Sequence, residues 1–222
     1  MMNDLSTTAA AAPVVLKLAV DDKSYEIVLP HAGTDYIQKG LVEKGTPYEE
    51  DMLRDIAARV PPGALVLDVG ANIGNHSLYL AAVGGCRVEA FEPNPELCEA
   101  LRDSVRRNGF DDRLHVHQLG LGRIEGVAEF AGHLPENLGA QQLALGSGGL
   151  VVKTLDSFAF AQPVRAMKID VEGMELDVLE GGRRLIERDR PILYIECATE
   201  SHFLTIRPSM LRRLPTLPMS TT

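Results

Sequence analysis

Residues 65–74, with the sequence LVLDVGANIG, constrain the fold more than any other segment of this 222-residue chain. The apolar run at 65–67 predicts a buried strand that delivers Asp68 at its end, and Gly70, Asn72 and Gly74 follow closely. Glycines at this spacing are typical of a tight turn from a strand into a helix. Open α/β sheets bind their ligands at the carboxyl ends of the strands, so this turn is a candidate binding loop.

The rest of the chain repeats this alternation of strand and helix. Apolar and β-branched runs predict strands, and apolar residues at helical spacing predict helices. The predicted strands are 64–68, 86–91, 113–119, 164–170 and 191–196, and the predicted helices between them are 75–82, 95–107 and 173–188. The sequence therefore predicts an α/β fold of the Rossmann-like class, with a mostly parallel sheet flanked by helices.

The main domain is predicted to span residues 48–200. Residues 1–47 are predicted to form a flexible N-terminus and an accessory hairpin, and a helix that ends at Pro61-Pro62-Gly63 opens the main domain. The Gly-rich segment 131–149 predicts a long surface loop that could cover a pocket. The Pro-rich tail, 201–222, is predicted to be irregular.

Charge, cysteine content and hydropathy limit the classes of substrate and the cellular compartments that fit this chain. The formal net charge of −9 opposes attraction to a phosphate backbone, so a nucleic-acid substrate is disfavoured. The three cysteines have neither disulfide-framework nor zinc-site spacing, which favours a reducing cytoplasm. We expect no membrane segment, because the apolar stretch near the N-terminus is too short to cross a bilayer. Whether copies form a homo-oligomer is left open.

The binding loop favours one class of cofactor. Dinucleotide-binding loops have the pattern GxGxxG, whereas this loop has GxNxG preceded by Asp68, whose charge would repel a pyrophosphate. An acid suits a ligand that carries ammonium and sulfonium charges, such as S-adenosylmethionine. Glu92 follows the next strand, 22 residues after Gly70, at a spacing suited to binding ribose hydroxyls. Dehydrogenases share that acid, so a nicotinamide oxidoreductase is the rival interpretation.

A second polar cluster follows the strand predicted at 164–170. Lys168, Asp170 and Glu172 alternate and would converge at a strand end, where a carboxylate could orient a hydroxyl or accept its proton. The alternative is that these acids cap the next helix and Lys168 balances their charge. Glu196 would join the same rim if its strand enters the sheet. His115 and His117 share a strand face, which solvation explains better than a metal pair.

The segments VLDVGANIGNHSLYLA, EAFEPNP, TLDSF, MKIDVEGMELDVLEGG and YIEC, in this order, resemble the FkbM family of S-adenosylmethionine-dependent methyltransferases over residues 48–197. The resemblance implies a class I methyltransferase domain. It assigns Asp68, Gly70, Asn72 and Gly74 to the cofactor loop, Glu92 to the ribose, and Lys168, Asp170 and Glu172 to the methyl group. Tyr48, Glu49, Asn137 and Glu196 are the weaker substrate candidates, and near the adenine the chain offers mainly the backbone of Gly120.

The resemblance implies methyl transfer to a hydroxyl of a small molecule such as a sugar, a polyketide or another secondary metabolite. The sequence contains no clear final β-hairpin after Cys197, so the sheet is expected to be incomplete. A cofactor-binding but catalytically silent module is therefore a further alternative. Dependence on a divalent metal is left open.

Overall fold

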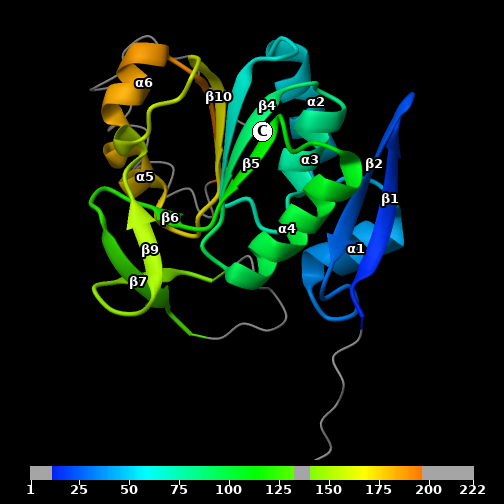
Figure 1. Cartoon of the computed structure of the whole chain (residues 1–222), viewed down its shortest axis with the longest axis horizontal. Helices are drawn as coiled ribbons and strands as arrows, with labels where there is room; N and C mark the ends of the chain where they lie inside the picture. The colour runs from blue at the N-terminus through cyan, green and yellow to red at the C-terminus, as the bar shows by residue number, and fades with distance from the viewer. Residues whose placement is uncertain (1–11, 133–140, 197–222) are drawn as a thin grey trace, which may run out of the picture.

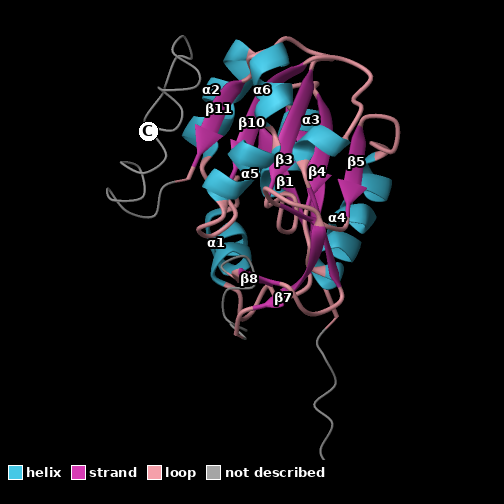
Figure 2. Ribbon diagram, turned by 90° about the vertical axis from the view of Figure 1, so that its left-hand side faces the viewer, coloured by secondary structure: helices cyan, strands magenta, loops and turns pink. Residues whose placement is uncertain are grey.

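The computed structural model describes residues 12–132 and 141–196. At its centre lies a parallel sheet (Figure 1), whose strands have the order β11-β10-β3-β4-β5 (Figure 2). The strands are β3 (Leu65–Val69), β4 (Arg87–Phe91), β5 (Leu114–His117), β10 (Val164–Ile169) and β11 (Ile192–Ile195). Four of them lie within the predicted ranges, and β3 extends one residue beyond the predicted 64–68. The predicted Rossmann-like α/β fold is confirmed.

Helices cover both faces of this sheet (Figures 1 and 2). On one face lie α2 (Glu50–Arg59), α3 (Asn75–Ala82) and α4 (Pro95–Asn108), and on the other lie α5 (Glu175–Gly181) and α6 (Arg183–Asp189). Alternate residues of β4 belong to different cores, because successive strand side chains point to opposite faces: Val88 and Ala90 pack with α3 and α4, and Phe91 packs on the other side.

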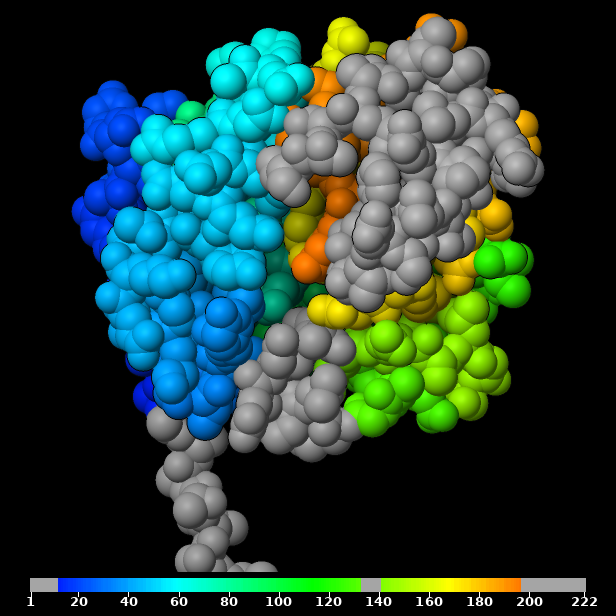
Figure 3. All heavy atoms as spheres, turned by 180° about the vertical axis from the view of Figure 1, so that it is seen from behind, coloured from blue at the N-terminus to red at the C-terminus, as the bar shows by residue number. Residues whose placement is uncertain are grey.

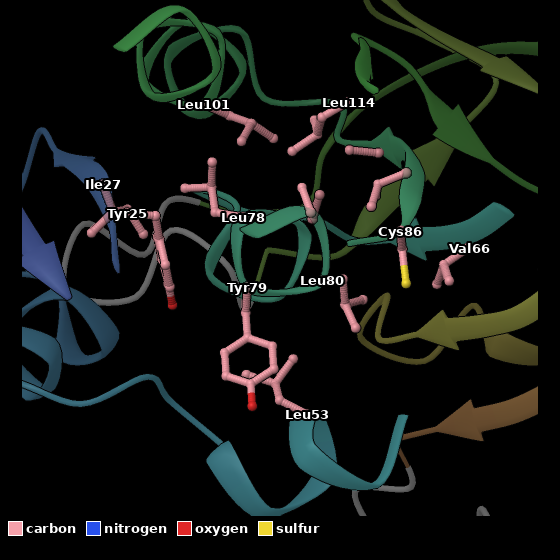
Figure 4. Packing of buried hydrophobic residues seen from close by; sticks show 14 of the residues in the cluster. Tyr25, Ile27, Leu53, Val66, Leu78, Tyr79, Leu80, Cys86, Leu101 and Leu114 are labelled. Carbon is pink, nitrogen blue, oxygen red and sulfur yellow. The ribbon is translucent and has the colours of Figure 1, made fainter. Parts of the chain in front are cut away.

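Helix α3 is the most enclosed element of the larger core. Every residue from Asn75 to Ala81 is buried, as expected of a helix that is surrounded by protein on all sides. Figure 4 shows Tyr79 of α3 directed toward Leu53 of α2, with Leu78 on another side of the helix. Because α3 begins directly after the predicted binding loop, this packing fixes the loop in place.

The N-terminal hairpin, β1 (Val14–Val20) and β2 (Lys23–Leu29), packs on α3 and α4. Side chains of α4 form hydrogen bonds with backbone groups of β2 that a neighbouring strand would otherwise bind. The amide of Val28 donates to Ser104 Oγ at 2.9 Å, and the Asn108 side chain bonds both the amide and the carbonyl of Glu26 at 2.8 and 2.7 Å. The predicted hairpin is thus tied to the main core, while the domain boundary at residue 48 stays a prediction.

A helix that the sequence analysis missed, α1 (Tyr36–Lys44), follows the hairpin. The side chain of Asp35 accepts a hydrogen bond from the amide of Gln38, and Gly45 ends the helix in the left-handed conformation. These are standard start and stop signals, so the sequence carried the information that predicts this helix.

A second, four-stranded sheet has the order β6-β9-β7-β8. Its strands are β6 (Gly120–Leu121), β7 (Gly126–Phe130), β8 (Leu143–Leu145) and β9 (Leu150–Lys153), followed by the short helix η2 (Leu155–Ser157). The prediction of an irregular loop over 131–149 is therefore wrong at 143–145, where β8 pairs antiparallel with β7. Residues 133–140 of the predicted lid lie outside the described residues.

The single helix predicted over 173–188 is also wrong. Two helices, α5 and α6, meet at Gly182, and the glycine pair there runs against neighbouring segments. A Cβ at Gly181 would overlap the carbonyl of Gly122, and one at Gly182 would lie 2.9 Å from Leu155 Cδ1. Close packing on η2 and on the segment after β6 breaks the helix.

Three further expectations concern the surface and the chain end. None of the helices in the described ranges is long and apolar enough to cross a bilayer. His115 and His117 both bond the Glu89 carboxylate, at 3.0 and 2.5 Å, so they have a protein partner as well as solvent. The expected absence of a final hairpin concerns residues 197–222, which lie outside the described residues.

Candidate active site

The first loop of the sheet passes very close to the end of β10. A Cβ at Gly70 would overlap the carbonyl oxygen of Asp170, and Gly70 has a φ of 80°, so only glycine fits there without strain. The amides of Gly70 and Ala71 both donate to the carbonyl of Phe91 at 3.0 Å. The loop is thereby held between the ends of β4 and β10.

Glu92 occupies the centre of this region and is buried. Its two oxygens accept hydrogen bonds from the amides of Asn72 and Asn94, at 2.9 and 2.8 Å. Burial raises the pKa of Glu92 to about 7, although those two amides act in the opposite direction. A carboxylate fixed in this way retains lone pairs for a pair of ligand hydroxyls.

One cavity beside Glu92, which we call the apolar cavity, has a largely hydrophobic lining. Its walls come from the ends of β3 and β4, from β6 to β8, and from the start of α5; they include Phe91, Leu119, Gly120, Leu121, Phe130, Leu143 and Met174. Gly120 packs closely against Leu143 in this wall, because a Cβ at residue 120 would lie only 2.7 Å from Leu143 Cδ1. Apolar walls next to a carboxylate that can accept hydrogen bonds from hydroxyls suit a nucleoside.

A second cavity, which we call the polar cavity, lies on the other side of Glu92. Gly70, Glu92 and Asp170 line both cavities. The remaining walls come from α1, the segment before α2, the start of α3, and the ends of β10 and β11; they include Tyr36, Tyr48, Glu49, Asn72, Asn75, His76, Lys168, Glu172 and Glu196. Figure 3 shows the outer surfaces that α1 and α2, in blue to cyan, contribute to the face near β11, in orange.

Lys168 is the buried cation of the polar cavity. Its Nζ lies 3.0 Å from Asp170 Oδ2 and 3.8 Å from Asp68 Oδ1, and it donates to the carbonyl of Gly70 at 3.3 Å. Burial alone would lower the pKa of Lys168, but the charges of Asp170 and Asp68 outweigh it and raise that pKa. Lys168 is therefore charged and joins β3, β10 and the first loop.

Asp170 and Glu196 form a coupled carboxyl pair at the ends of β10 and β11. Burial would raise the pKa of Asp170, but the charge of Lys168 and hydrogen bonds from Glu196 and Lys168 lower it to about 2. The hydrogen bond to Asp170, together with burial, raises the pKa of Glu196 to about 8. Near neutral pH, Glu196 thus carries the proton and Asp170 the negative charge.

Glu172 completes the acidic group. Oxygen atoms of Asp170, Glu172 and Glu196 lie within 4.8 Å of one another, a grouping that could hold a metal ion. Glu172 has a left-handed φ of 51°, and Glu175 fixes its loop by accepting from the amides of Val171 and Gly173 at 3.2 and 3.1 Å. Strand β10 ends at Ile169, so this turn, and not the alternation of a strand, brings Glu172 to the group.

The segment before α2 supplies another wall. Asn75 bonds both the amide and the carbonyl of Tyr48, at 3.0 and 2.9 Å, which fixes this segment to the start of α3. His76 Nε2 lies 3.0 Å from Glu49 Oε2, and Glu49 has a left-handed φ of 55°. The hydrogen bond from His76 lowers the pKa of Glu49.

Left-handed backbone conformations are concentrated at the polar cavity. Five described non-glycine residues have a positive φ, and three of them, Glu49, Asn72 and Glu172, line this cavity. Each such residue costs on the order of 1 kcal/mol, and strain of this kind is typical of binding and catalytic sites. The polar cavity is therefore the best candidate for the reaction site.

Most of the predicted site residues meet here. Gly120 lines the apolar cavity. The polar cavity is lined by the other predicted residues that meet here: Gly70, Asn72, Glu92, Lys168, Asp170, Glu172, Glu196, Tyr48 and Glu49. Two cofactor-loop residues line neither cavity: Asp68 is fully buried and accepts from Ser77 Oγ at 2.5 Å, and a Cβ at Gly74 would overlap Leu101. Direct cofactor contacts of Asp68 and Gly74 stay predictions, and Asn137 lies outside the described residues.

Sequence reasoning missed Asn75, His76 and Tyr36. The first two directly follow the glycine loop, so their place at the start of α3 was a usable signal. Nothing in the sequence marked Tyr36 as part of the site, because α1 reaches the cavity only through the tertiary fold.

Comparison with known families decides the classification. The sequence profile described as "Methyltransferase FkbM domain" matches residues 68–213, which is more than half of the chain. The chain belongs to the FkbM family of S-adenosylmethionine-dependent methyltransferases. The predicted family is thus confirmed.

Two curated proteins are similar to this FkbM-family chain. Hexuronic acid methyltransferase AglP of Haloferax volcanii is 30% identical over 139 residues, which cover 60% of this chain and 56% of AglP. AMB antimetabolite synthetase AmbE of Pseudomonas aeruginosa is 34% identical over 110 residues, 47% of this chain and 5% of AmbE. The chain therefore spans little more than half of AglP and a small part of AmbE.

One similar solved structure is that of the Pyrococcus abyssi tRNA (uracil-54, C5)-methyltransferase in complex with S-adenosyl-L-homocysteine. Its TM-score to this FkbM-family chain is 0.49, and the two sequences are 14% identical. The match covers 87% of this chain and 37% of the tRNA methyltransferase.

The two cavities fit S-adenosylmethionine. The apolar cavity suits its adenine, Glu92 between the cavities suits the ribose hydroxyls, and the polar cavity offers anionic groups to a sulfonium and an ammonium. Asp68 is fully buried beside Lys168, and its direct contact with this ligand stays a prediction. The carboxylates that line the polar cavity suit a cationic ligand in any case.

Proposed function

We propose that this FkbM-family protein is an O-methyltransferase that acts on a hydroxyl group of a small molecule. The observation that carries the proposal is Asp170, which lines both cavities and is bound by Lys168 and Glu196 in the polar one. An ionised carboxylate held by a buried cation supports a meeting of the methionine end of the cofactor and an acceptor at this point.

S-adenosylmethionine supplies an electrophilic methyl group when bound, and the protein aligns a nucleophile with it. Asp170 can accept a hydrogen bond from the acceptor hydroxyl and hold its oxygen in line for attack. Lys168 keeps Asp170 ionised and prevents it from turning away, because the two atoms are only 3.0 Å apart. Glu172 lies on the same rim and orients further hydroxyls of the acceptor.

The lining of the polar cavity supports a hydroxylated acceptor. Carboxylates, two side-chain amides and two tyrosines surround it, and these groups bind sugar hydroxyls well. The similarity to AglP, which is named for its action on a hexuronic acid, supports a sugar among the candidate classes. A polyketide or another hydroxylated secondary metabolite fits the same chemistry.

Tritium transfer from methyl-labelled S-adenosylmethionine tests the proposal. The panel contains hexuronic acids, neutral sugars, phenols, short polyketide alcohols and total tRNA. We expect label in at least one hydroxyl compound, and Asp170→Asn should reduce that transfer about 100-fold while S-adenosylhomocysteine still binds. Glu99→Gln, on the exposed face of α4, is the matched control. Transfer to tRNA alone, or tight cofactor binding without transfer to any compound, would reject the proposal.

A further inference from the structure

The proposed O-methyl transfer, on which this inference rests, releases a hydroxyl proton that needs an acceptor. Asp170 is poorly suited, because Lys168 and Glu196 already bind it and hold its pKa near 2. Glu196 is protonated near neutral pH, since its pKa is about 8. These carboxyl groups can therefore orient a hydroxyl but are weak bases for it.

His76 lines the same polar cavity from the first turn of α3. Its Nε2 bonds Glu49 at 3.0 Å, and only 6% of the residue is exposed. Within the described part of the chain, no hydrogen bond joins its other ring nitrogen, Nδ1. An ionised Glu49 keeps the ring hydrogen on Nε2, which leaves the lone pair on Nδ1.

The arrangement of Glu49 and His76 is built into the fold. The two hydrogen bonds between Asn75 and the backbone of Tyr48 hold the segment before α2 against the first turn of α3. Glu49 adopts a left-handed conformation there, although it is not a glycine. A conformation that costs free energy is maintained at the point where Glu49 meets His76.

We propose that His76 is the general base of the reaction and that Glu49 is its positioning residue. As the acceptor oxygen forms its bond to the methyl carbon and the bond from carbon to sulfur breaks, the hydroxyl proton passes to Nδ1 of His76. The electron pair of the broken bond stays on sulfur, which gives neutral S-adenosylhomocysteine. Glu49 stabilises the imidazolium that results, as a carboxylate does when it orients a catalytic histidine.

The charges around His76 favour this role. Glu49 adjoins it directly, and Lys168, Asp170, Glu172, Glu196 and Glu92 line the same cavity from β10, β11 and β4. Asp170 lies within electrostatic range of His76, because the charge of His76 is one of the influences that lower the pKa of Asp170. The acids outnumber Lys168, so a positive charge that develops on His76 is stabilised.

The experiment compares two isosteric variants. His76→Gln places an amide nitrogen where Nε2 lies, so it can keep the hydrogen bond to Glu49 but cannot act as a base. Glu49→Gln keeps the size of the side chain and removes its charge. His115→Asn, at the edge strand and outside both cavities, is the matched control. All variants are assayed with the best hydroxyl acceptor from the tritium panel, between pH 5 and 9.

We expect kcat to fall at least 100-fold in His76→Gln and about 10-fold in Glu49→Gln, with little change in the KM for S-adenosylmethionine. The acidic limb of the wild-type pH profile should be absent in His76→Gln. His115→Asn should match the wild type. Wild-type kcat in His76→Gln, with an unchanged pH profile, would overturn the assignment.

A second measurement needs no acceptor and therefore separates this inference from the proposed function. ¹⁵N-histidine NMR of the S-adenosylhomocysteine complex, with His76 assigned through His76→Gln, reports which ring nitrogen carries the hydrogen. We expect Nε2 to be protonated and Nδ1 to be bare at neutral pH. A hydrogen on Nδ1 alone would overturn the inference even if O-methyl transfer is found. Absence of any hydroxyl acceptor would instead reject the proposed function.

Discussion

Replacement of Lys168 by methionine tests whether the buried ion group stabilises the fold as its geometry implies. Lys168 is 4% exposed, and its Nζ lies 3.0 Å from Asp170 and 3.8 Å from the fully buried Asp68. Methionine has a similar length and shape but leaves both carboxylates without their cation. Removal of one partner of a buried ion pair costs about 3–5 kcal/mol, mainly because the remaining charge is stranded.

Urea unfolding followed by circular dichroism at pH 7 measures this loss. For a domain of this size, a decrease of about 3–5 kcal/mol in the free energy of unfolding lowers the Tm by roughly 6–20 °C. The matched control is Lys17→Met on the exposed face of β1, which should differ from the wild type by less than about 0.5 kcal/mol. Addition of Asp170→Asn to Lys168→Met should restore part of the loss, because it removes one of the two stranded charges.

The loss should also depend on pH in a defined direction. Burial alone would raise the pKa of Asp170, but the charge of Lys168 and its hydrogen bond help to lower that pKa to about 2, below the ordinary value of 3.8. Asp170 therefore stabilises the folded protein above about pH 4, and this contribution is lost as the pH falls toward 2. The difference between wild type and Lys168→Met should shrink over that range. A loss below 0.5 kcal/mol at pH 7, equal to that of the control, would refute the reasoning.

Three further predictions concern the cofactor site and its surroundings. Gly70→Ala should abolish the thermal shift caused by S-adenosylhomocysteine, because its Cβ would overlap the Asp170 carbonyl. The control Gly109→Ala, with φ of 63° and open space around it, should cost about 1 kcal/mol and leave that shift intact. Equal thermal shifts in the two variants would contradict the close approach at Gly70. Glu92→Gln should weaken S-adenosylhomocysteine binding about 10-fold by calorimetry. Wild-type affinity should fall below pH 7, as Glu92 with its pKa of about 7 takes up a proton, and a flat pH profile would argue against ribose binding by its carboxylate. The wild type should lose stability as the pH rises through about 8, because Glu196, with its raised pKa, then loses its proton and the pair Glu196 and Asp170 becomes doubly charged. Glu196→Gln should remove this loss. Persistence of the loss in the variant would exclude this pair as its source.

Much of the site was predictable because the ends of buried strands have a recognisable sequence pattern. An apolar run followed by an acid or a glycine marks the carboxyl end of a buried strand, and in a parallel sheet those ends share one edge. Gly70, Glu92, Asp170 and Glu196 were placed at that edge from the sequence, and the structure brings them together. The cofactor class and the family followed from the same segments.

The roles within the site were not predictable in this way. The sequence predicts Asp68 as the acid that selects a cationic cofactor, and that role stays a prediction. Nothing in the sequence indicates that the fold buries Asp68 against Ser77 and Lys168. His76 had no distinguishing pattern, because its partner Glu49 lies far away in the sequence and takes an unusual backbone conformation. Neither relation has a period or a spacing that a sequence pattern could reveal.

The sequence by itself determined the alternation of strands and helices, the parallel sheet and the glycine loop at its edge, because these depend on local periodicity and on the backbone freedom of glycine. Tertiary structure alone decided which acids are ionised, which are buried and which face a cavity. Those properties depend on distances between residues that are remote in the chain, such as Lys168 with Asp68 and Glu49 with His76. Charge and burial in the site arise only when the separate strand ends are assembled.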